Sequence, residues 1–186
     1  MSKQECPQQQ ESDNGQVQSQ QKAGLVKVIS AITIDELTDV LMNLVEDDSI
    51  EFEYEVHENT ETGYFTIECK MFDTEFLIMP LGGGPFYDDL LLTAFFSAYL
   101  DPEVLCTEFN SRYKFASAVP ITVESDDGDD EDDCQIIEVE KLVLLQGGVT
   151  DEHLEATIKL WTGMLMFAEH LFEGPTVEAT DSDDSE

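Results

Sequence analysis

IIEVEKLVLLQGGVTDEHLEATIKLWTGMLMFAEHLF, residues 136–172, is the stretch of the chain that decides its fold. Its first part is rich in β-branched residues and leucine, which predicts a strand, and Gly147-Gly148 break that strand. A long amphipathic helix is expected next, because Thr150 suits the N-cap and apolar residues then recur at three- and four-residue steps, at Leu154, Ile158, Trp161, Leu165, Ala168 and Phe172. Gly174-Pro175 is the predicted stop. An apolar helix face this wide needs a sheet to cover it.

The residues before this stretch predict another helix and a set of antiparallel strands. Thr33 and Glu36 form a capping-box pair at the start of a short amphipathic helix. Residues 50–58 alternate apolar and polar side chains, which indicates a half-buried strand with an acidic outer face. Residues 65–71 and 75–79 continue the pattern, so three hairpin-linked strands are expected to form a meander.

The middle of the chain predicts further helix and strand. Residues 90–100 are apolar on nearly all sides, which predicts a second helix that is buried within the domain or at a subunit interface. A short helix over 102–110 and a strand over 113–123 are expected to follow, and Pro120 limits that strand to an edge or a bulge. The predicted fold class is α+β: an antiparallel five-stranded sheet with helices packed on one face, in the order α-β-β-β-α-β-β-α.

Composition bounds the domain organisation and the partners. The 186 residues include 42 acidic and 8 basic ones, for a formal net charge of −34. Such a surface argues against nucleic acid and anionic membrane as partners and favours encounter with basic proteins. One domain is expected over residues 25–173, between a glutamine-rich arm at 1–24 and an acidic tail at 174–186, both expected to be disordered.

The cysteines and the N-terminal region predict a cytoplasmic protein. The four cysteines are widely spaced and form no C-x-x-C pair, so free thiols are expected and a zinc site is not. The N-terminal region lacks the apolar core of a signal peptide, and no run approaches the ~18 apolar residues of a membrane span.

Two motifs suggest candidate binding sites. The acidic segment 126–133 suits hard cations by composition, but placing Gly128 sixth in an EF-hand loop puts Val123 first, where a ligand is needed. A solvated hairpin loop is the favoured interpretation, with a weak cation site as the alternative. Glycines 82–84 lack the Lys-Ser/Thr of a phosphate-binding loop, so they indicate a flexible turn rather than an anion cradle.

Catalytic signatures are missing from the sequence. It contains no G-x-S-x-G elbow and no H-E-x-x-H, and surface positions explain His57, His153 and His170. No catalytic, cofactor-binding or metal-binding residues are therefore predicted, and the chain is predicted not to be an enzyme.

Apolar side chains suggest a binding surface instead. Methionine suits surfaces that repack around different ligands, and the sheet edge offers main-chain groups to an extended peptide. The candidate peptide-binding residues are Met71, Ile78, Met79, Met164 and Met166, with core filling as the commoner alternative for the methionines.

The chain resembles the YbjN family, described as bacterial sensory transduction regulators. The resemblance covers roughly residues 33–172 and includes Asn110, then Lys114-Phe115-Ala116 entering a strand, and above all the Gly147-Gly148-Val149-Thr150 junction before a helix that carries Trp161. It implies a fold similar to type III secretion chaperones, which often pair and hold extended segments of client proteins. The acidic insertion after Val123 and both tails depart from the family's pattern.

The leading hypothesis is a non-enzymatic protein- or peptide-binding module of the bacterial cytoplasm, with a chaperone-like or regulatory role. Its expected partner is a client protein or peptide, favoured to be basic, and a homodimer is left open. The alternative is an acidic decoy that mimics nucleic acid and occupies basic proteins, or a surface adapted to high salt. An uncharacterised enzyme is the third hypothesis.

Overall fold

The computed structural model describes residues 27–123 and 134–174. Within them the elements follow the order α1-β1-β2-β3-β4-α2-β5-β6-α3. Their bounds are α1 Ile34–Val45, β1 Phe52–Glu58, β2 Phe65–Met71, β3 Thr74–Gly83, β4 Phe86–Ser97, α2 Pro102–Arg112, β5 Ser117–Val123, β6 Cys134–Leu144 and α3 Asp151–Phe172. The α+β class is confirmed, with a sheet of six strands in place of the five predicted.

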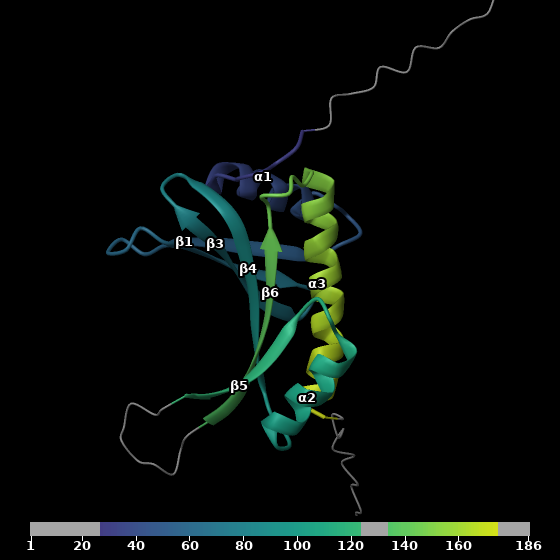
Figure 1. Ribbon diagram of the computed structural model, residues 1–186. Coiled ribbons are helices and arrows are strands. Elements are labelled where there is room, and N and C mark those ends of the chain that lie inside the picture. The colour runs from purple at the N-terminus through teal and green to yellow at the C-terminus, as the bar shows by residue number, and fades with distance from the viewer. Residues whose placement is uncertain (1–26, 124–133, 175–186) are drawn as a thin grey trace, which may run out of the picture.

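The sheet has the strand order β1-β2-β3-β4-β6-β5, and every neighbouring pair of strands is antiparallel. The predicted meander is therefore confirmed and extends to four strands. β6 returns between β4 and β5, so β1 and β5 are the two edges. Figure 1 shows α1, α3 and α2 along one face of the sheet, which confirms the prediction of helices on a single face.

The predicted helix over residues 90–100 is wrong, because this run forms strand β4. β4 pairs with β3 on one side and with β6 on the other. Its even-numbered residues 90–96 are buried on the side of the helices, while Leu91 is half-buried and Phe95 is exposed on the other face. A strand in that position carries apolar side chains without alternation, and such a run cannot be told from a buried helix by periodicity. Glycines 82–84 accordingly lie at the β3–β4 hairpin and not at the start of a helix.

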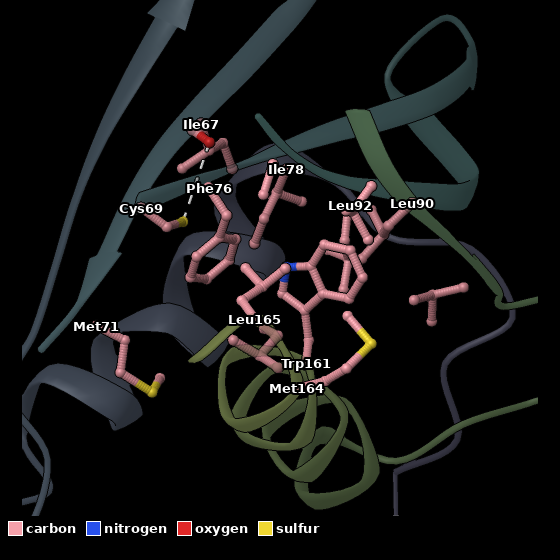
Figure 2. Close-up of a cluster of buried hydrophobic side chains, with 14 of the residues drawn as sticks. Ile67, Cys69, Met71, Phe76, Ile78, Leu90, Leu92, Trp161, Met164 and Leu165 are labelled. Atoms are coloured by element: carbon pink, nitrogen blue, oxygen red, sulfur yellow. Dashed lines mark hydrogen bonds between the residues drawn. The ribbon is translucent and has the colours of Figure 1, made fainter. Parts of the chain in front are cut away.

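Helix α3 covers the sheet with its wide apolar face. Its fully buried residues include Leu154, Ile158, Trp161, Leu165 and Phe172. Figure 2 shows the indole of Trp161 among side chains of β3, β4 and α3, including Ile78, Leu92 and Met164. The predicted core role of this helix is therefore confirmed.

The predicted helix ends are also confirmed. The Thr33 hydroxyl accepts a hydrogen bond from the backbone N–H of Glu36, whose carboxylate accepts one from the Thr33 N–H, so the capping box is complete. The Thr150 hydroxyl accepts the N–H of His153 at the start of α3. Gly174 follows the C-cap of α3 with φ 74°, the left-handed conformation that glycine adopts readily.

Aromatic side chains fasten the C-terminal end of α3 to α2 and to the sheet. The ring centroids of Phe109 and Phe172 lie 5.4 Å apart, as do those of Phe96 and Phe172. Tyr113 adds a fourth ring at 4.7 Å from Phe109. α2 therefore packs as part of the same core, and does not lie free at the edge of the sheet.

Polar contacts join α3 to the end of α1. Lys159 Nζ donates to Asp47 Oδ2 at 2.9 Å, and Asn43 donates to Glu155 at 2.8 Å. Hydrogen bonds from Ser49 and then from Lys159 lower the pKa of the Asp47 carboxyl to about 2. Because this pKa is lowered in the folded state, the interaction stabilises the fold above the ordinary pKa of aspartate and is lost as the pH falls through about 2.

The turn before α3 depends on a glycine. Gly148 has φ 79°, and a Cβ added there would lie 2.7 Å from Val28 Cγ1. Its neighbour Val149 bonds to Ile29 in both directions, through N–O distances of 2.6 and 2.8 Å, so the turn also holds the N-terminal segment.

Gly148→Ala is expected to lower the free energy of unfolding by about 1–3 kcal/mol, because a side chain is strained at this backbone conformation. Gly147→Ala is the matched control, since a Cβ at Gly147 meets nothing within 4 Å, and it is expected to stay within about 0.5 kcal/mol of the parent protein. Denaturant unfolding measures both, and equal effects at the two positions would contradict the strain.

Cys69 and Cys106 are free and buried, in agreement with the expected free thiols, and burial raises the pKa of each thiol. The expected disorder of 1–24 and of the tail after Gly174, and both interpretations of the acidic segment 126–133, lie outside the described residues. Among the described residues, no helix is long and apolar enough to cross a membrane.

Candidate functional site

The face of the sheet that points away from the helices is the candidate site, and we call it the open face. Side chains alternate along each strand, so every second residue of β1, β2, β3, β4 and β6 lies there. None of the described helices packs against it (Figure 1). This face combines an apolar region with an acidic one.

The apolar strip crosses three neighbouring strands, β3, β4 and β6. In the register, Met79 lies opposite Leu91, and Leu91 lies opposite Leu142. Leu142 and Leu144 are 51% and 60% exposed, and both lie beyond Glu140, where the pairing of β6 with β5 ends. The strip consists of Leu77, Met79, Leu81, Leu91, Leu142 and Leu144. Only the row of Met79, Leu91 and Leu142 is apolar on all three strands, because Asp89 of β4 lies between Leu81 and Leu144 in the register.

The acidic region lies beside the strip, with three residues on β1 and β2, one on β3 and two on β6. It consists of Glu53, Glu55, Glu68, Glu75, Glu138 and Glu140. Glu55 lies directly opposite Glu68 in the register, which places two like charges side by side. Repulsion at such a pair is unfavourable, and a cation brought by a partner would relieve it.

The described residues supply little positive charge near the acidic region. Lys70 Nζ lies 3.9 Å from a carboxylate oxygen of Glu75, and His57 Nε2 lies 3.4 Å from Glu68. Both pairs are solvent-exposed, where an ion pair contributes little to stability. The acidic region therefore keeps most of its negative charge for an approaching molecule.

A shallow hollow of about 570 Å³ lies where the acidic region meets the centre of the sheet. Glu53, Glu55, Glu68 and Glu75 line it together with Phe95 and Thr93. Phe95 is exposed, whereas Thr93 is fully buried and donates towards Glu138 at 3.2 Å and towards the carbonyl of Val139 at 3.3 Å. The hollow thus presents carboxylates around an apolar floor.

The structure separates the predicted peptide-binding residues. Met71, Ile78 and Met164 are buried in the core, so a ligand on the surface does not reach them (Figure 2). Met166 is exposed on the outer side of α3. Met79 is the one member that lies in the apolar strip, where it is partly buried.

No match to this chain is found among protein families, curated proteins or solved structures. The resemblance to the YbjN family, and the likeness to type III secretion chaperones that it implies, stay predictions.

The sequence does not predict that Leu142 and Leu144 lie on the surface, because they belong to a continuous apolar run with Val143 and Leu145. A continuous apolar run predicts burial on both faces, and the alternation between core and surface does not show in it. Only the register of β6 against β4 separates the two sets.

Proposed function

We propose that this chain is a non-enzymatic binding protein that holds an extended segment of another protein on its open face, with chaperone-like or regulatory consequences. The exposure of Leu142 and Leu144 on a face without helices is the observation that carries the proposal. Contiguous exposed apolar side chains rimmed by polar ones are typical of protein-binding surfaces.

The two regions of the face would contribute differently to binding. Burial of leucine side chains on the apolar strip supplies affinity, at roughly 1.5–3 kcal/mol for each one fully buried. The carboxylates raise the rate of encounter with basic segments, as complementary charge generally does. A client segment that is both basic and apolar uses both regions at once. The proposed compartment is the cytoplasm.

Leu142→Ser/Leu144→Ser is expected to weaken binding at least about 10-fold, because two apolar contacts are lost. The probes are fluorescent peptides selected from a random library on the parent protein, and anisotropy measures their affinity. Leu160→Ser is the matched control, since Leu160 is 58% exposed on the outer side of α3. It is expected to change affinity less than about twofold.

The decoy hypothesis predicts a different result, because a decoy would use the carboxylates alone. If changing Glu138 and Glu140 to glutamine abolished binding and the leucine changes did not, the acidic decoy would replace the proposed function. Unchanged affinity in both variants would refute a binding role for the open face.

A further inference from the structure

The two edges of the sheet differ in whether another strand can join them. At β5, the Asn110 side chain accepts the N–H of Ala118 and donates to its carbonyl, both at 2.8 Å. Ala118 therefore directs its N–H and its carbonyl away from β6. Pro120, two residues later, has the same orientation and offers an added strand no N–H. The β5 edge is closed by a side-chain amide and a proline.

The β1 edge is open among the described residues. Phe72 donates its N–H to the carbonyl of Glu51, and Asn59 donates to that of Tyr64, which fixes the alternation of hydrogen bonds with β2. The odd-numbered residues of β1 therefore bond to β2, and the even-numbered ones point their N–H and carbonyl groups outward. No hydrogen bond within the described residues satisfies these outward groups, which belong to Phe52, Tyr54, Val56 and Glu58.

The side chains of β1 define what fits beside it. Glu53 and Glu55 lie on the open face, where they line the acidic hollow. Phe52 is buried, and Tyr54 and Val56 are half-buried against the core on the helix side. An added strand would therefore meet acidic neighbours on one face and apolar neighbours on the other.

A second copy of this chain is a poor occupant of the β1 edge. Antiparallel pairing of β1 with itself would bring Glu53 and Glu55 against the same glutamates of the copy, and like charges opposite one another are destabilising. Charges on an edge strand commonly protect against such self-pairing. The same charges favour a strand that carries cations.

We infer that β1 accepts, as an antiparallel seventh strand, an extended partner segment in which lysine or arginine alternates with apolar residues. The basic side chains face Glu53 and Glu55, and the apolar ones lie beside Tyr54 and Val56. Main-chain hydrogen bonds supply affinity, and the alternation supplies selectivity. This inference rests on the proposed function, because it concerns the same class of partner, but it uses the edge instead of the apolar strip.

The test uses the full chain and two synthetic peptides of equal composition, one alternating lysine with valine and one with all lysines before all valines. The alternating peptide is expected to bind at least about 10-fold more tightly, since only it matches both faces of β1. Equal affinity of the two peptides would overturn the inference.

N-methylation of the peptide tests the added strand without altering the protein. In an antiparallel pair, residues that bond to each other place their side chains on the same face, so the valines would direct their N–H groups to β1. Methylating the backbone nitrogens of the valines is expected to abolish binding. Methylating the backbone nitrogens of the lysines is expected to be tolerated. Equal sensitivity at both sets would overturn the strand pairing.

Glu53→Gln/Glu55→Gln is expected to lower the affinity for the alternating peptide by about 3- to 10-fold and to reduce the salt dependence of its binding. Glu103→Gln/Glu169→Gln is the matched control, because both residues are exposed on α2 and α3 and the change in net charge is the same. Equal losses in the two variants would overturn the role of β1.

Failure of this inference is separable from failure of the proposed function. If library-selected peptides lose affinity in Leu142→Ser/Leu144→Ser while the alternating peptide fails the N-methylation test, the open face binds and the β1 edge does not. If neither surface shows a variant-sensitive interaction, both proposals fall.

Discussion

Trp161→Ala is expected to lower the free energy of unfolding by about 3–5 kcal/mol, the usual cost of removing a large aromatic side chain from a core. Trp161 is fully buried on the face of α3 that packs against β3 and β4 (Figure 2). Alanine would leave a cavity at the centre of the domain, and the rigid sheet can close it only in part. Denaturant unfolding followed by far-ultraviolet circular dichroism measures the change.

Two further variants make the Trp161 prediction specific. The indole Nε1 has no hydrogen-bond partner among the described residues, so Trp161→Phe also removes an unsatisfied donor and is expected to cost about 2 kcal/mol or less. Leu160→Ala, one residue away on the solvent side of α3, is expected to stay within about 0.5 kcal/mol of the parent protein. A similar loss for Leu160→Ala and Trp161→Ala would contradict the orientation of α3.

Phe109→Ala is expected to cost a similar amount, about 3–5 kcal/mol, because its ring is fully buried between α2 and α3. Its loss removes the contact with Phe172 and loosens α2, which also carries Asn110 at the β5 edge. We therefore expect hydrogen exchange in α2 and at Ala118 to become faster than in the parent protein. The change in β3 and β4 is expected to be smaller. Exchange measured by mass spectrometry, together with denaturant unfolding, tests both effects.

Val104→Ala provides the control for Phe109, because Val104 lies on the same helix and is 58% exposed. It is expected to change the free energy of unfolding by less than about 0.5 kcal/mol. If exchange at Ala118 stayed as slow in Phe109→Ala as in the parent protein, α2 would not be what protects the β5 edge.

The helix ends and strands β1 and β2 were predictable because their signals are local. The capping pair of Thr33 and Glu36 acts within one helical turn, and the alternation in β1 needs one apolar face and one wet face. α3 was equally clear, since a stripe of apolar residues follows one side of this 22-residue helix. In each case the interactions that form the element lie close together in the chain.

β4 and the open face were not predictable for the opposite reason. A strand paired on both sides and covered on one face has an apolar run that resembles a buried helix, and only its partners β3 and β6 decide the outcome. Leu142 and Leu144 likewise become surface residues only because β6 aligns beside β4 with that set of side chains turned from α3.

Local sequence was therefore enough for the fold class, the caps, the closing helix and the strong negative charge. Three-dimensional pairing was needed to tell which leucines face solvent, which methionines are core, and which sheet edge is closed by Asn110 and Pro120. The physical reason is that a binding surface on a sheet is assembled from residues on different strands, and their alignment depends on hydrogen bonds between segments far apart in the chain.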